Sequence, residues 1–212
     1  MSRIWSVTIL VIVSCSYSSL GTAAGGGAMK APNVEGKSPD QLAIESYNAG
    51  LRHRDKAWKH QEKVVASTRE KDRIKYQRRA NKEFEKAAKR YRDAIEYQPE
   101  LYQAHASLGY ALRETGEYDA ALNAYAESLA LRPQYTPAIE YLAETHLALG
   151  EVDKVTDAYS KLVELDPVKA DELLAAINEW LANPPKNTNP DAIKQLSDWL
   201  PSAPYASSIF SN

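Results

Sequence analysis

The chain has 212 residues, of which 44% are apolar and 25% charged, a composition typical of a soluble globular protein with one ordinary domain and its tails. A single cysteine and only 9 glycines exclude a disulfide scaffold, a cysteine-rich zinc site and a glycine-rich fibre. The net charge of -2 names no partner, so function must be sought in how residues are arranged along the chain.

Residues 1–24 have the organisation of an export signal. Arg3 is the only charged residue before Lys30, and residues 4–13 are apolar except for Ser6 and Thr8. As a helix this run would be about 15 Å long, which suits a signal-peptide core better than a membrane span. Residues 12–15, Ile-Val-Ser-Cys, resemble the bacterial lipobox, which would make Cys15 a lipidated first residue. Residues 22–24, Thr-Ala-Ala, instead suit simple secretion after cleavage before Gly25.

Both processing routes predict an exported protein. A serine rather than an aspartate follows Cys15, and by bacterial sorting rules this favours a periplasmic protein anchored at the outer membrane. Residues 25–39 begin with three glycines and show no apolar periodicity, so they predict a flexible linker. A folded domain is expected from residue 40 to residue 182.

A 34-residue period governs that domain. Residues 102–135 and 136–169 are identical at nine aligned positions. These pairs are Ala104/Ala138, Leu108/Leu142, Gly116/Gly150, Glu117/Glu151, Asp119/Asp153, Ala124/Ala158, Tyr125/Tyr159, Leu131/Leu165 and Pro133/Pro167. The apolar spacing predicts two helices per unit, with Gly116 ending the first helix and Pro133 ending the second.

This pattern resembles the tetratricopeptide repeat family. The resemblance rests on Leu108-Gly109, Gly116, Tyr118, Ala121, Tyr125 and Pro133, and it extends over roughly residues 39–181. It implies an all-α solenoid of helical hairpins with about three repeats. Residues 170–182 are expected to form a capping helix over the last repeat, and residues 183–212 a proline-containing tail with a short helix at 191–200.

The first repeat, residues 40–101, is expanded. Phe84, Tyr91 and Pro99 repeat the second-helix pattern, but the matching first-helix pattern lies far upstream, at residues 46–51. Neither glycine nor proline occurs between Leu51 and Gln98. This predicts two long helices with a turn near residues 67–68, and a long disordered loop is the alternative.

The expanded hairpin is strongly basic. Residues 51–92 hold 16 basic and 6 acidic residues, whereas the rest of the chain holds 10 basic and 22 acidic residues. The basic residues nearest the expected turn are Arg69, Lys71, Arg73, Lys75, Arg78 and Arg79. Two interpretations are open: a solvated pair of helices, or an electrostatic dock for anionic lipid headgroups or an acidic partner. Nucleic acid is not an expected partner of an exported protein.

No sequence motif supports catalysis, a cofactor or a metal site, because phosphate loops, nucleophile elbows and His-Glu-x-x-His motifs are all absent. The family resemblance instead implies a peptide-binding groove lined by first helices. Its candidate residues are Tyr47, Asn48, Leu51, Arg54, Gln103, Ser107, Tyr110, Arg113, Tyr141 and Glu144. We therefore expect a non-enzymatic scaffold in the bacterial cell envelope that binds a peptide or protein segment. The alternatives are a structural accessory subunit of an envelope assembly, and lipid or polymer binding through the basic hairpin.

Overall fold

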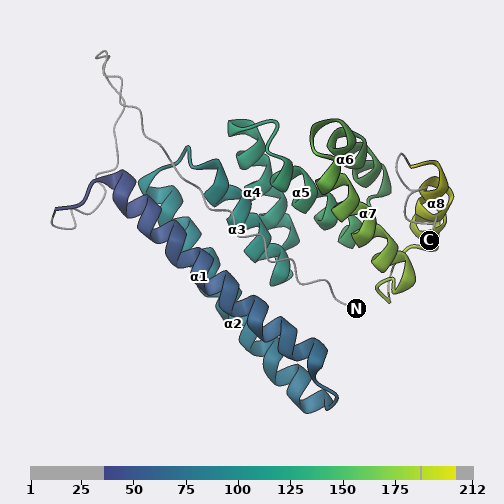
Figure 1. The fold of residues 1–212 in the computed structure, drawn as a ribbon, viewed down its shortest axis with the longest axis horizontal. Helices are drawn as coiled ribbons and strands as arrows, with labels where there is room; N and C mark the ends of the chain where they lie inside the picture. The colour runs from purple at the N-terminus through teal and green to yellow at the C-terminus, as the bar shows by residue number, and fades with distance from the viewer. Residues whose placement is uncertain (1–35, 187, 204–212) are drawn as a thin grey trace.

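The computed structural model describes residues 36–186 and 188–203, and within these ranges it is all-α, with no strand. The helices run as antiparallel pairs along a curved row (Figure 1). In chain order they are α1 (Pro39–Ala66), α2 (Glu70–Tyr97), α3 (Tyr102–Glu114), α4 (Tyr118–Leu131), α5 (Thr136–Leu149), α6 (Val152–Leu165), α7 (Pro167–Ala182) and α8 (Pro190–Trp199), followed by the short 3-10 helix η1 (Leu200–Ser202). The expected export signal and most of the expected linker lie outside the described residues.

The first hairpin consists of two 28-residue helices joined by a three-residue turn. Ser38 begins α1 with a capping box: its hydroxyl accepts the Gln41 N–H at 3.2 Å, and the Gln41 side chain accepts the Ser38 N–H at 2.9 Å. Unbroken helix on both sides of the turn excludes the disordered-loop alternative for this segment. The expectation of a first repeat with extended helices is confirmed.

A small residue facing a tyrosine sets the spacing of the two helices in each hairpin. A Cβ on Gly109 would lie 2.6 Å from the ring of Tyr125, and a Cβ on Gly50 would lie 2.4 Å from the ring of Tyr91. Ala143 and Tyr159, both fully buried, occupy the matching places in the next unit. Gly50 precedes its tyrosine by 41 residues and Gly109 by 16, so the first hairpin contains a 25-residue insertion between the two contacts.

Two glycines end the first helices of the regular repeats. Gly116 has φ +85° and Gly150 has φ +74°, the left-handed conformation that glycine adopts without steric cost. The N–H of Glu117 donates to the Leu112 carbonyl at 2.9 Å, and the N–H of Glu151 donates to the His146 carbonyl at 2.9 Å. Both repeats therefore turn into their second helix through the same backbone geometry.

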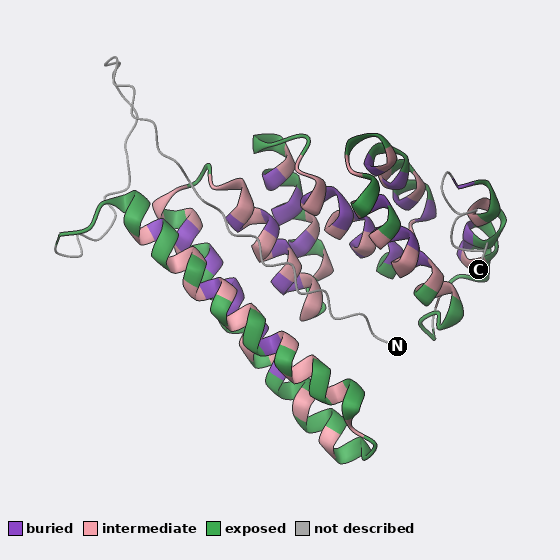
Figure 2. Cartoon of the chain, viewed as in Figure 1, coloured by how far each residue is buried: buried purple, intermediate pink, exposed green. Residues whose placement is uncertain are grey.

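The buried side chains follow the row of helices but stop short of the distal end of the first hairpin (Figure 2). At the other end of the row, Leu173, Leu174 and Ile177 of α7 are fully buried against α5 and α6, as a capping helix requires. Beyond it, α8 adds Leu196 to the same core, and Trp199 meets Tyr159 edge-on with ring centroids 5.2 Å apart.

Candidate functional site

Side chains from the first helices of successive hairpins meet on one face, which we call the first-helix face. Tyr47 of α1 and Ser107 of α3 approach to 3.4 Å through their hydroxyl oxygens. Tyr110 of α3 and Tyr141 of α5 have ring centroids 5.1 Å apart. Each of these contacts joins two helices that are separated in sequence by a second helix. The face is thus continuous from α1 to α5.

Aromatic rings form most of this face. Trp58 of α1 donates its indole N–H to the Tyr110 hydroxyl at 2.7 Å. Tyr102 and Tyr135, at the starts of α3 and α5, meet edge-on at 4.9 Å. The Arg54 guanidinium lies 4.1 Å from the centre of the Trp58 ring, a cation–π distance. Such rings offer flat apolar area with polar edges, the chemistry of many peptide-recognition surfaces.

Ion pairs connect the same face from α3 to α7. Arg113 lies 2.8 Å from Glu144 and 3.2 Å from Glu114. Lys169 of α7 lies 2.7 Å from Glu140 and 2.5 Å from Glu172. These four carboxylates share two cations, so the network carries an excess of acidic groups. All six side chains are at most about one-fifth exposed.

Burial and the shortage of cations shift the pKa values of the groups in this network. Burial, together with the nearby Glu144 carboxylate, raises the pKa of Glu140 despite the opposing Lys169. Burial also raises the pKa of Glu144, and Arg113 opposes that rise. Although burial lowers the pKa of Arg113, Glu144, Glu114, Tyr125 and Tyr110 all raise it, and the net pKa lies above its usual value. Arg113 therefore stays charged, whereas Glu140 is the carboxyl most easily kept protonated.

The ten candidate residues are distributed unevenly over this face. Six of them make contacts between helices: Tyr47, Ser107, Tyr110, Arg113, Tyr141 and Glu144. Leu51 packs against the core of the first hairpin, and Arg54 reaches Asp55 and Trp58 within its own helix. Asn48 is exposed. Gln103 has a buried side-chain oxygen without a hydrogen-bond partner.

Sequence reasoning missed seven residues of this face: Trp58, Tyr102, Glu114, Tyr135, Glu140, Lys169 and Glu172. Trp58 follows Leu51 and Arg54 at helical spacing, so extending that pattern by one turn would have found it. A 34-residue step from Tyr135 leads to Lys169. No periodic signal indicates Glu140 and Glu172, because they contribute charges specific to the α5–α7 junction.

The remaining predicted residues lie elsewhere. Cys15 is outside the described residues. Arg69 stands in the turn, and Lys71, Arg73, Lys75, Arg78 and Arg79 lie on α2 near the distal end of the hairpin. Over residues 36–186 and 188–203, no group of three His, Cys, Asp or Glu side chains is placed to hold a metal ion. None of the helices in these ranges has the length and apolar character needed to cross a membrane.

The fold and this face define a repeat protein built of helical hairpins. Residues 112–177 match the model of the tetratricopeptide repeat family. No curated protein matches its sequence.

The solved structures that resemble it include the following two. One is the first repeat domain of Spaghetti (RPAP3) bound to the HSP90 peptide SRMEEVD, with 16% identity, a TM-score of 0.50, and coverage of 68% of this chain and 96% of that one. The other is MamA protein, with 17% identity, a TM-score of 0.41, and coverage of 81% and 97%. At such identities the likeness concerns the fold alone.

Proposed function

We propose that the chain is a non-enzymatic interaction module whose first-helix face binds an extended segment of a partner protein. The observation that carries this proposal is the unbroken tract of aromatic rings from α1 to α5, edged by ion pairs that reach α7. Aromatic anchors in a partly dry setting supply most of the binding energy at protein interfaces. The peptide held by the repeat domain of RPAP3 supports the same use of this fold.

The charges of the face favour a particular kind of segment. Four carboxylates surround the two cations Arg113 and Lys169, so an acidic peptide would meet repulsion at the α5–α7 end. A peptide with aliphatic or aromatic residues and at least one basic residue fits better. The basic side chain would lie near Glu140, where a further cation would favour ionisation of that carboxyl.

Selection from a library of random peptides displayed on phage would test this proposal. The selected peptides should be apolar and basic, and their affinity for Tyr141→Ala should fall at least about tenfold, the loss expected for truncating one aromatic anchor. Tyr118→Ala is the matched control, because Tyr118 begins α4, a second helix. Thermal unfolding must show that both variants remain folded. Equal affinity of all three proteins for the selected peptides would refute the assignment to the first-helix face.

The proposal also places the protein outside the cytoplasm, in a bacterial cell envelope, with a lipid on Cys15. Support comes from the sequence alone, in the apolar run 4–13 and the lipobox-like residues 12–15. In a bacterial host, fractionation and intact-mass measurement of the native chain and of Cys15→Ala test this placement. A native chain that carries no lipid and begins at Gly25 would refute lipidation and leave export by simple secretion. An unprocessed chain in the cytoplasm would refute both lipidation and export.

A further inference from the structure

The distal end of the first hairpin has no core of its own. We define the hairpin tip as residues 58–79. None of them is buried, whereas Ala57 and Ala80 on either side are completely buried. The tip holds 8 basic and 3 acidic residues, a net charge of +5. Like charges therefore crowd on two helices that little apolar packing holds together, and counter-charges from outside would relieve their repulsion.

The local acids neutralise only part of the tip. Asp72 pairs with Arg69 at 2.6 Å, and Glu70 lies 3.7 Å from Arg73. Six other basic residues of the tip, and Lys82 just beyond it, take part in no ion pair within the described parts of the chain. Four of these seven, Lys71, Lys75, Arg78 and Lys82, follow one another at intervals of four, three and four residues, which places them on one face of α2, over about 16 Å. We call these four residues the basic stripe.

The basic stripe lies beside an apolar side chain, Ile74. All four of its residues and Ile74 line an open hollow of about 710 Å³ on α2. A second hollow of about 580 Å³ shares Ile74, Arg78 and Lys82 and extends to Val64 of α1. Ile74 itself is 51% exposed. The surface thus combines long, flexible cations with an accessible apolar group.

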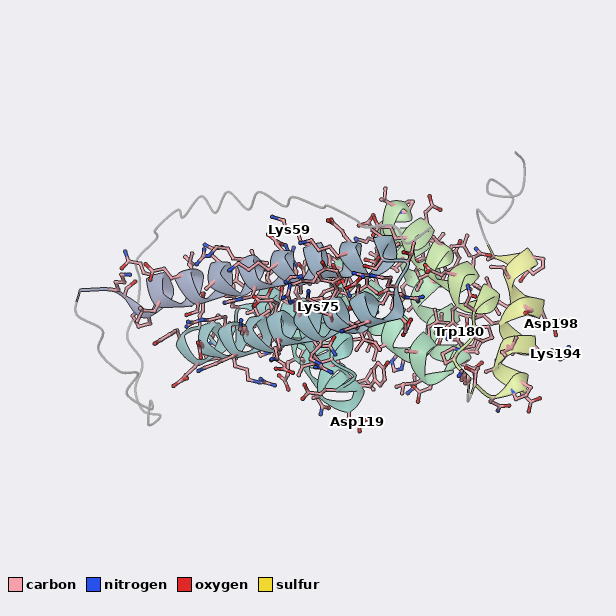
Figure 3. The ribbon with its side chains drawn as sticks, turned by 90° about the horizontal axis from the view of Figure 1, so that it is seen from below. Lys59, Lys75, Asp119, Trp180, Lys194 and Asp198 are labelled. Carbon is pink, nitrogen blue, oxygen red and sulfur yellow. The ribbon has the colours of Figure 1, made fainter. Side chains whose placement is uncertain are left out.

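From this arrangement we infer that the hairpin tip docks on the surface of an anionic lipid bilayer, with the basic stripe on the headgroup phosphates and Ile74 at the boundary of the acyl chains. Lipids can move sideways to meet flexible cations, so a shallow surface whose four stripe cations have no ion-pair partner suits them, even though Asp72, paired with Arg69, also lines the hollow. The rest of the molecule adds orientation, because residues 99–203 hold 7 basic and 17 acidic residues and would be repelled by the same bilayer. In Figure 3, Lys59 and Lys75 lie on the hairpin, far along the molecule from Lys194 and Asp198 of α8.

Vesicle flotation tests this inference with the full chain carrying Cys15→Ser, so that a lipid on Cys15 cannot act as anchor. The vesicles are phosphatidylcholine alone or phosphatidylcholine mixed with phosphatidylglycerol. We expect the chain to bind better to the anionic vesicles, and its binding to weaken steeply with salt. Reversing the whole basic stripe (Lys71→Glu, Lys75→Glu, Arg78→Glu and Lys82→Glu) should lower partitioning onto anionic vesicles by a factor on the order of one hundred or more.

A matched variant distinguishes an effect of charges at the hairpin tip from an effect of the net charge of the whole chain. Reversing Arg52, Lys56, Lys89 and Arg92 changes the net charge equally, and these exposed residues lie nearer the base of the hairpin, also outside any ion pair within the described ranges. That variant should lose only a few-fold in partitioning. Ile74→Ser should lose roughly three- to tenfold, because it removes the apolar contact while keeping every charge. Circular dichroism should find the same helix content in all variants.

Three results would overturn the inference. The first is equal loss of vesicle binding in the stripe variant and the base variant. The second is binding of the native chain to polyglutamate without binding to anionic vesicles, which would indicate an acidic protein partner. The third is salt-reversible self-association in light scattering that replaces vesicle binding. Tyr141→Ala should bind vesicles normally, so failure of the peptide-binding proposal would leave this inference standing.

Discussion

The first hairpin and the two regular hairpins begin from the same contact and then diverge. A glycine faces a tyrosine ring at Gly50–Tyr91 and at Gly109–Tyr125, where an added Cβ would overlap the ring, and Ala143 faces Tyr159 at the matching place of the third hairpin. The regular hairpins end within a few residues of this contact. The first hairpin continues into a tip without buried residues and with a net charge of +5. One molecule therefore contains a segment specified by packing and a segment that packing does not specify.

This difference separates what holds the fold from what is free to serve a partner. Close contacts between helices fix the first-helix face, because each aromatic ring on it touches a ring or hydroxyl from another helix. Beyond Trp58, which begins it, the tip has few such constraints, so its sequence can be dominated by charge. A recognition surface made of rigid rings and one made of flexible cations suit different partners.

The largest loss of stability is expected from adding a side chain at the glycine that faces the tyrosine ring. Gly109→Ala and Gly50→Ala should each lower the free energy of unfolding by about 2–3 kcal/mol, since the new Cβ would overlap a buried tyrosine ring. Urea unfolding followed by circular dichroism measures this loss. Gly116→Ala is the control, because a Cβ there meets no atom and only the left-handed backbone is strained, at about 1 kcal/mol. A loss at Gly109 but not at Gly50 would break the equivalence of the two hairpins.

The sequence predicts this part of the molecule well, because the contact repeats. The 34-residue period, the glycine ends and the small residues facing tyrosines all specify helical hairpins, and the all-α repeat fold with an extended first hairpin is confirmed. The length of the insertion is harder to predict from the sequence, because nothing in the basic segment repeats. Gly50 marks it only once its contact with Tyr91 is known.

A smaller effect is expected from the ion-pair network. Burial raises the pKa of Glu140 from 4.5 to about 8, so the folded protein holds this proton more tightly than the unfolded chain does. The stability from this group is fully present below about pH 4.5 and is lost as the pH rises toward about 8. The loss should be at least about 1.4 kcal/mol, the value of one pKa unit. Glu140→Gln should remove this dependence.

Thermal unfolding across this pH range measures the effect. Glu164→Gln is the matched control, since Glu164 is exposed on α6. Its stability profile should follow that of the native chain. A Glu140→Gln profile with an unchanged slope would mean that Lys169 keeps Glu140 ionised throughout, and the preference for a basic peptide at this end would lose its support.

The first-helix face itself was only partly predictable. Periodicity identifies side chains that share a face, such as Tyr110 and Tyr141, because helical spacing and the 34-residue step together locate them. It does not identify partners contributed by the ends of neighbouring helices. Lys169 is the second residue after the proline that begins α7, and its pairing with Glu140 depends on how closely α7 packs on α5.

Removing the hydrogen bond between the first hairpin and α3 should cause a still smaller loss of stability. Trp58→Phe removes the indole N–H that donates to the Tyr110 hydroxyl at 2.7 Å, at a cost of about 1 kcal/mol. Tyr110→Phe removes the same hydrogen bond from the other side. A double-mutant cycle in urea should therefore find the two losses less than additive. Strict additivity would mean that this hydrogen bond does not join the long hairpin to the regular repeats.

The smallest effect on stability is expected from removing the tip. Replacing residues 63–75 by a short glycine-containing turn deletes no buried side chain and leaves both Ala57 and Ala80 in place. The lost helical hydrogen bonds exchange for bonds to water, and the removed charges no longer repel, so the free energy of unfolding should change by less than about 1 kcal/mol. Ala80→Asp, one residue beyond the tip and fully buried, should cost about 2 kcal/mol or more by comparison. The shortened chain should still bind the peptides selected on the first-helix face and should lose its preference for anionic vesicles. Collapse of the shortened chain would mean instead that the basic helices support the repeats, and the contrast between a packed base and a free tip would fail.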